Sequence, residues 1–163
     1  MMGTEVLCRP GGVGRASAVV GMTCFGATME IQTFLLAQTV TMRGNRFDIG
    51  QAPIANMTCT AEVEFPTHFT LPAFILLRRD SWAAYAPYTV RLTLVNEDGE
   101  AVGRPNNLVW RGHFPAGVWF AQLMAKIDFE FPAPGRYRLE LTPDEGQTGQ
   151  AYHYNISITE SAE

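Results

Sequence analysis

From residue 30 onward, apolar and polar side chains alternate with a period of two, which predicts strands that bury one face. Four segments show this clearly, with polar residues such as Arg91, Lys126, Arg138 and His153 between the apolar positions. The apolar sets are Tyr88, Val90, Leu92 and Leu94; Ala121, Leu123, Ala125, Ile127, Phe129 and Phe131; Tyr137, Leu139 and Leu141; and Tyr154, Ile156 and Ile158. We expect these sets to line one core.

Other segments predict further strands and the turns between them. Residues 31–40 and 69–77 are more continuously apolar, as strands covered on both faces are. Residues 46–49 can pair back on the first of these through a turn centred on Gly44, and residues 108–114 form another candidate strand. A turn at residues 96–99 and one at residues 132–135 contain the Gly, Asp and Pro residues that turns require.

These elements predict an all-β fold. About seven to nine short strands without an amphipathic helix of normal length favour a single antiparallel β-sandwich of immunoglobulin-like type. The 163 residues fit one domain, which we place at residues 29–163.

Residues 1–28 differ in character from the remainder of the chain. They contain six glycines and show neither strand nor helix periodicity. Three interpretations stay open: translation that begins at Met29, a disordered tail, and an export signal. The charged and apolar regions of a signal are present, but the apolar stretch is short and contains Gly21 and Gly26.

Charge and cysteine content narrow the partners and the compartment. The net charge is −4 and no basic stripe exists, so nucleic acid is not an expected partner. Cys8, Cys24 and Cys59 lack the spacing of a zinc site, and free thiols favour a reducing compartment. No apolar run is long enough to span a membrane. We therefore expect a soluble, cytoplasmic protein that binds no metal and no cofactor.

No motif indicates catalysis. His68, His113 and His153 lie far apart in the sequence, and no serine occupies a Gly-x-Ser-x-Gly turn. A small hydrolase would require His113 to meet Asp80 or another carboxylate within hydrogen-bond reach. We expect no catalytic residue and no enzymatic activity.

Two aromatic segments, residues 79–88 and 109–120, are interpreted as loops between strands, and together they contain all three tryptophans. Exposed Trp and Tyr side chains commonly anchor protein partners or stack on sugars. Packing at the end of the core is the competing explanation. The candidate interface residues are Trp82, Tyr85, Trp110, Arg111, His113, Trp119 and Phe120.

Several strand-and-turn motifs carry a family resemblance over residues 33–159. They are Leu35-Leu36-Ala37, Ile49 after a glycine-centred turn, residues 91–102 and residues 131–141. With these motifs the chain resembles a family of bacterial proteins with an immunoglobulin-like sandwich and no established function. The resemblance implies the fold alone, because the family offers no catalytic residues to carry over.

The sequence therefore predicts a non-enzymatic interaction or structural module. Its partner would be another protein or a second copy, bound through the aromatic loops or a sheet edge. The alternative is a small carbohydrate-binding domain that uses Trp82, Trp110 and Trp119, which would require exposed, coplanar indole rings.

Overall fold

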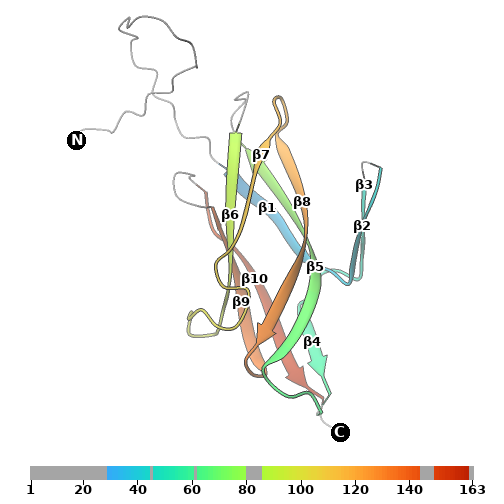
Figure 1. The fold of residues 1–163 in the computed structure, drawn as a ribbon, viewed down its shortest axis with the longest axis vertical. Coiled ribbons are helices and arrows are strands. Elements are labelled where there is room, and N and C mark those ends of the chain that lie inside the picture. The colour runs from blue at the N-terminus through green and yellow to red at the C-terminus, as the bar shows by residue number, and fades with distance from the viewer. Residues whose placement is uncertain (1–28, 45, 61, 80–85, 144–148, 162–163) are drawn as a thin grey trace, which may run out of the picture.

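The computed structural model describes residues 29–44, 46–60, 62–79, 86–143 and 149–161. These residues form ten strands and no helix, which confirms the all-β prediction (Figure 1). The strands are β1 (Met29–Leu36), β2 (Thr39–Arg43), β3 (Arg46–Gly50), β4 (Asn56–Cys59), β5 (Thr67–Arg79), β6 (Ala86–Val95), β7 (Leu108–Phe114), β8 (Phe120–Phe131), β9 (Gly135–Pro143) and β10 (Tyr152–Glu160). The proposed N-terminal extension, residues 1–28, lies outside the described residues.

The strands form three sheets. The first has the order β1-β5-β8, the second β4-β10-β9-β6-β7, and β2 and β3 form a two-stranded hairpin. Neighbouring strands run antiparallel except β4 and β10, which are parallel. Figure 1 shows the β2–β3 hairpin standing beside β5, apart from the rest.

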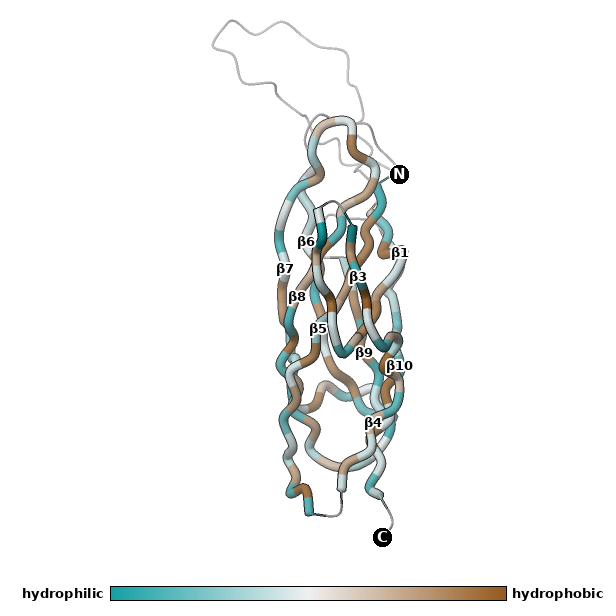
Figure 2. Tube along the Cα trace, turned by 90° about the vertical axis from the view of Figure 1, so that its right-hand side faces the viewer, coloured by the Kyte–Doolittle hydropathy of each residue, from teal (hydrophilic) through white to brown (hydrophobic). Residues whose placement is uncertain are grey.

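The two larger sheets enclose one core. Every second side chain of β6, β9 and β10 is buried, as the alternation predicts, and Figure 2 shows the matching change of hydropathy along the strands. Ring contacts join the sheets: Phe34 meets Tyr154 with centroids 5.3 Å apart, and Phe131 meets Tyr137 at 5.1 Å. Each fully buried large apolar side chain contributes about 1.5–3 kcal/mol.

The prediction of one strand over residues 31–40 is wrong. β1 ends at Leu36, where the Ala37 amide donates to the Pro72 carbonyl oxygen at 3.0 Å and the Ile54 amide donates to the Leu36 carbonyl oxygen at 2.9 Å. The chain then leaves the sheet, and residues 39–43 form β2, to which β3 pairs. The sequence also gave no sign of β4, because four residues are too few for alternation to show.

β5 is covered fully on one face only. Ala73, Ile75 and Leu77 are completely buried, whereas Phe74 and Leu76 on the other face are half-buried. The β2–β3 hairpin supplies part of the second cover, because the ring of Phe47 lies 5.3 Å from that of Phe74. The outer surface of this sheet thus remains partly apolar and partly open.

Candidate functional site: an open strand edge

The five predicted interface residues that lie within the described ranges fall into two groups, on β7 and at the entry to β8. Trp82 and Tyr85 lie outside the described residues. Trp110, Arg111 and His113 belong to β7, which pairs with β6. The candidate strand at residues 108–114 is therefore confirmed, and the interpretation of residues 109–120 as a single loop is wrong. The connecting loop is residues 115–119, because the alternation of β7 continues to Phe114.

β7 separates its predicted residues onto two faces. Trp110 pairs with buried Val90 and packs half-buried against the core. Arg111 and His113 are exposed on the opposite face of the five-stranded sheet. Trp119 and Phe120 are neighbours where the chain enters β8, and they are 41% and 48% exposed.

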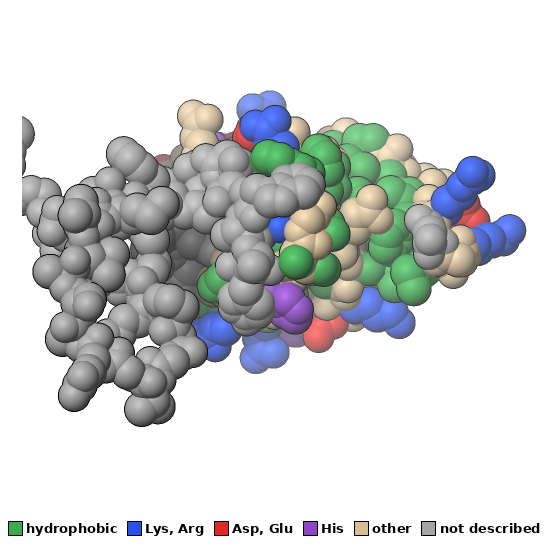
Figure 3. Space-filling model, turned by 90° about the horizontal axis from the view of Figure 1, so that it is seen from above, with side chains coloured by type: hydrophobic (Ala, Val, Ile, Leu, Met, Phe, Trp, Pro, Cys, Tyr) green, Lys and Arg blue, Asp and Glu red, His purple; other side chains and the backbone are tan. Residues whose placement is uncertain are grey.

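Exposed apolar side chains concentrate at this point of the molecule. Large hydrophobic residues with high exposure are few among the described residues, and four of five lie within the seven residues from Val118 to Met124. Figure 3, which looks onto this end, shows hydrophobic side chains gathered there. Sequence analysis did not identify Met124 as a candidate. Its position offered a sign, because Met124 is an apolar residue at one of the outward positions of β8, between the polar Gln122 and Lys126.

A buried arginine holds the β7–β8 loop. Arg79, 2% exposed, donates from Nε to the Val118 carbonyl oxygen at 2.7 Å and from Nη2 to that of Pro115 at 3.0 Å. Its backbone amide donates to the Trp119 carbonyl oxygen at 3.0 Å. These bonds to a charged donor fix the conformation in which the loop enters β8.

β8 is an edge strand, and the direction of its backbone groups follows from two observations. The Arg79–Trp119 bond shows that odd-numbered residues bond to β5. At the far end, Glu130 exchanges two 3.1 Å bonds with Arg104, so even-numbered residues face away from β5. Within the described part of the chain, the outward-facing amide and carbonyl groups of Gln122, Met124, Lys126 and Asp128 have no ladder partner.

The other edges of the two larger sheets carry features that interrupt or shorten them. β1 has a bulge between Ile31 and Thr33, β4 is four residues long, and β7 contains Gly112. Such features hinder the addition of a further strand. β8 extends over 12 residues in unbroken register with β5, and it contains neither Pro nor Gly. It is therefore the edge best suited to pair with another strand.

The core-facing side of β8 is also incompletely covered near its start. Ile127, Phe129 and Phe131 are buried, but Ala121, Leu123 and Ala125 are only half-buried. The first half of β8 thus exposes apolar surface on both faces beside an unpaired backbone edge.

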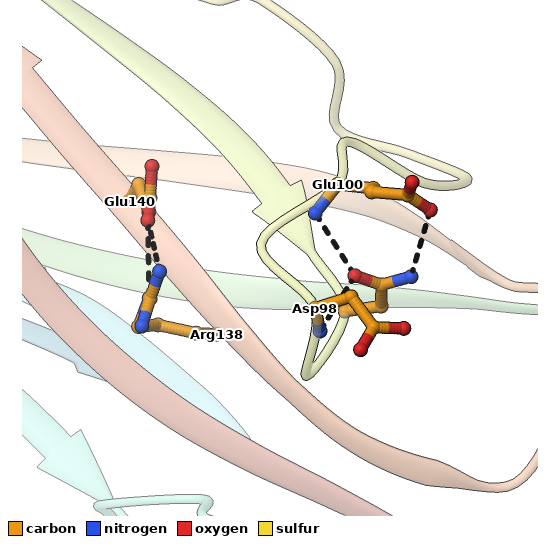
Figure 4. Close-up of polar contacts among 5 residues, drawn as sticks. Asp98, Glu100, Arg138 and Glu140 are labelled. Carbon is orange, nitrogen blue, oxygen red and sulfur yellow. Dashed lines mark hydrogen bonds and ion pairs between the residues drawn. The ribbon is translucent and has the colours of Figure 1, made fainter.

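The outer face of the five-stranded sheet carries a polar groove of about 640 Å³. Arg136 and Arg138 line it, and each has an acidic neighbour. Arg136 Nε lies 4.0 Å from Glu97. Arg138 Nη2 lies 2.5 Å from Glu140, as Figure 4 shows. Asn96 organises the adjoining turn: its side-chain Oδ1 accepts hydrogen bonds from the backbone amides of Asp98 at 3.0 Å and Glu100 at 2.9 Å. The groove's cations are thus balanced by carboxylates of the same surface.

The acidic neighbour of His68 is shared with an arginine. His68 Nδ1 lies 3.9 Å from a Glu130 carboxylate oxygen, but Arg104 Nε lies 3.5 Å from the same oxygen. Asp80, the predicted partner of His113 in a hydrolase, lies outside the described residues. The part of the chain with assigned structure contains no group of three side chains placed to hold a metal.

Burial perturbs three tyrosines. It raises the pKa of Tyr88, Tyr137 and Tyr154 above that of a free phenol, although backbone hydrogen bonds partly oppose the shift at Tyr137 and Tyr154. Tyr154 Oη donates to the Ile54 carbonyl oxygen at 2.7 Å. These tyrosines are structural members of the core.

The fold and this site define an all-β protein in which, among the described residues, the edge of β8 lacks a ladder partner from Gln122 to Asp128. No protein-family model matches the chain, and no curated protein matches it. Among solved structures, a β-glucosidase from Kluyveromyces marxianus matches 87% of this chain at 8% identity and a TM-score of 0.38. A family 123 glycoside hydrolase from Clostridium perfringens matches 66% at 13% identity and a TM-score of 0.32.

These structural matches are too distant to indicate a function for this chain. The chain spans 16% of the first protein and 23% of the second. Across the ranges described in the structure, no helix has the length and apolar character needed to cross a membrane.

Proposed function

We propose that this protein is a non-enzymatic interaction module that accepts a strand of a protein partner on the edge of β8. The observation that carries the proposal is the uninterrupted 12-residue edge strand with exposed apolar side chains at its start. Strand addition provides affinity through backbone hydrogen bonds and specificity through alternate side chains.

The energetic basis is modest for each group but repeated along the strand. Each added hydrogen bond contributes about 0.5–1.5 kcal/mol net. Phe120 and Met124 are near half exposure, so a partner that covers them gains roughly half of the 1.5–3 kcal/mol of a fully buried side chain. The ordered β7–β8 loop reduces the entropy lost on binding, because Arg79 already holds it.

The finer fold assignment, a single immunoglobulin-like sandwich, is part of the proposal. Tyr137, at the start of β9, donates its hydroxyl to the Ala133 carbonyl oxygen at 2.5 Å, four residues upstream. A tyrosine that bonds back across such a corner is frequent in immunoglobulin-like domains. We also propose the family resemblance and a cytoplasmic location.

The carbohydrate-binding alternative has no specific support among the described residues. It requires exposed indole faces, but Trp110 packs against the core. Of the two tryptophans within the described ranges, only Trp119 offers an exposed ring, and one ring is a poor basis for the stacking platform that the alternative predicts.

The proposal can be tested by photocrosslinking in cells that naturally express the protein. We would replace Met124 with p-benzoylphenylalanine and compare two second substitutions, Gln122→Pro and Gln122→Ala. The proline removes an outward-facing amide of β8 without removing a bond to β5, whereas the alanine removes the same side chain and keeps the amide.

We expect a covalent protein adduct that persists in Gln122→Ala and is lost in Gln122→Pro, with circular dichroism confirming that both variants fold. Absence of any adduct, or an adduct insensitive to the proline, would contradict docking on this edge.

A further inference from the structure

Resting on the proposed function, we infer that the partner of β8 is a second copy of this chain, paired antiparallel about Met124. The three-stranded sheets of the two copies would then join into one continuous six-stranded sheet of order β1-β5-β8-β8-β5-β1 across a two-fold axis. The inference rests on the self-complementarity of β8 in this register.

The register uses the open stretch of the edge and nothing beyond it. With Met124 opposite Met124 of the second copy, residues 120–128 of each chain lie opposite each other. This stretch ends before Glu130, whose outward backbone groups are already bonded to Arg104. Gln122, Met124 and Lys126, which direct their backbone groups outward, then meet outward-directed groups of the other copy.

Charges and side-chain sizes also fit this register. Lys126 lies opposite Gln122 of the second copy, and Asp128 lies opposite Phe120, so no like charges are opposed. On the core-facing side, Leu123 lies opposite Ala125, which places a large side chain beside a small one. Leu123 and Ala125 direct their backbone groups toward β5, so they do not bond to each other across the two copies. Such pairs bring their side chains closest, so this register covers the half-buried side chains of Leu123 and Ala125.

Neighbouring registers lack these features. An axis at Lys126 opposes two lysines. An axis at Ala125 opposes two alanines and brings Phe120 against Glu130, where Arg104 already occupies the edge. An axis at Gln122 leaves only the first five residues of β8 in the ladder. Pairing about Met124 therefore uses the edge most fully.

Disulfide trapping tests the register directly, in the full chain with Cys8→Ser and Cys24→Ser. Backbone-bonded pairs in antiparallel strands have Cα atoms about 5.5 Å apart, within the roughly 4.4–6.8 Å span of a disulfide. Met124→Cys should therefore form a covalent dimer by itself. Gln122→Cys alone and Lys126→Cys alone should yield about tenfold less, because identical residues two positions from the axis lie too far apart. Mixing these two variants should restore the dimer.

A charge exchange at the axis gives a second readout by light scattering after gel filtration. The unmodified chain should have twice the 18.0 kDa monomer mass. Met124→Lys and Met124→Glu should each be monomeric, since like charges meet at the axis, and an equimolar mixture should be dimeric again. Circular dichroism confirms that each variant folds.

The outcomes separate this inference from the proposed function. A monomeric unmodified chain, or trapping that favours a residue other than Met124, overturns pairing about Met124. If the proline-sensitive photoadduct at Met124 then contains a different protein, docking on β8 stands and self-pairing falls. If no photoadduct forms, both fall.

Discussion

The guanidinium carbon of Arg79 lies 5.5 Å from the centroid of the Phe114 ring, so the last residue of β5 stacks on the last residue of β7. This contact joins the two larger sheets at the end where β8 begins. The same guanidinium bonds two carbonyl oxygens of the β7–β8 loop, at Pro115 and Val118. A charge buried in this way couples the core to the loop that presents Trp119 and Phe120.

Replacing Arg79 should destabilise the fold strongly. Arg79→Met keeps much of the apolar length but leaves the Val118 and Pro115 carbonyl oxygens without this donor, and we expect a loss of about 2–4 kcal/mol in the free energy of unfolding. Urea unfolding measures it. The control is Arg78→Met, whose exposed ion pair with Glu30 should cost about 1 kcal/mol or less. Equal losses in the two variants would contradict the anchoring role of Arg79.

Gly103→Ala should destabilise the protein where the chain closes the end of β8. Gly103 has φ of +53°, and an added Cβ would overlap the Glu130 carbonyl oxygen, which is backbone and cannot move aside cheaply. Gly44→Ala is the matched control, since its φ is +60° but nothing lies within 4 Å of the added atom. We expect about 1 kcal/mol for Gly44→Ala from backbone strain alone, and clearly more for Gly103→Ala. Similar thermal shifts would show that the Glu130 contact is unimportant.

Alkaline pH should weaken the fold through its buried phenols. Burial raises the pKa of Tyr154 in the folded state above the unfolded value of 10.0, so the folded state favours the neutral phenol. This contribution is complete below about pH 10 and is lost as the pH rises through the raised folded-state pKa. Urea midpoints measured from pH 8 to 11 should fall more steeply for the unmodified chain than for Tyr154→Phe. Parallel profiles would exclude Tyr154 as a source of the loss.

The alternation of apolar and polar residues predicted the strands that bury one face in the core. β6, β9 and β10 have the inward faces that the period of two implies, and each strand extends one or two residues beyond its alternating set at both ends. The break after Leu36 depends instead on bonds from Ala37 to Pro72 and from Ile54 to Leu36, which join residues far apart in the chain. Local pattern cannot reveal such pairing.

The candidate site was predicted only in part, for a related reason. The sequence left exposure and core packing open for these aromatic residues: Trp119 and Phe120 are exposed, whereas Trp110 is turned to the core by the register of β7 with β6. The open edge of β8 is a property of sheet order: within the ranges that the structure describes, β8 pairs with β5 on one side and meets Arg104 at Glu130 on the other. Met124 was the local sign of this edge, because it is an apolar residue at a position of β8 where the alternation otherwise places polar residues.

The β2–β3 hairpin should depend on a single aromatic contact for its position. Phe47 and Met42 are cross-strand partners, but only Phe47 meets a ring of the larger sheet, that of Phe74. Phe47→Ala removes a ring pair that contributes about 0.5–1.5 kcal/mol beyond its buried area. Hydrogen exchange followed by mass spectrometry should then show faster exchange across residues 39–50, with little change in β9 or β10. Met42→Ala, at a position 64% exposed, should leave these rates unchanged. If Phe47→Ala instead accelerates exchange throughout the core, the hairpin is an integral part of the fold and not a separately held element.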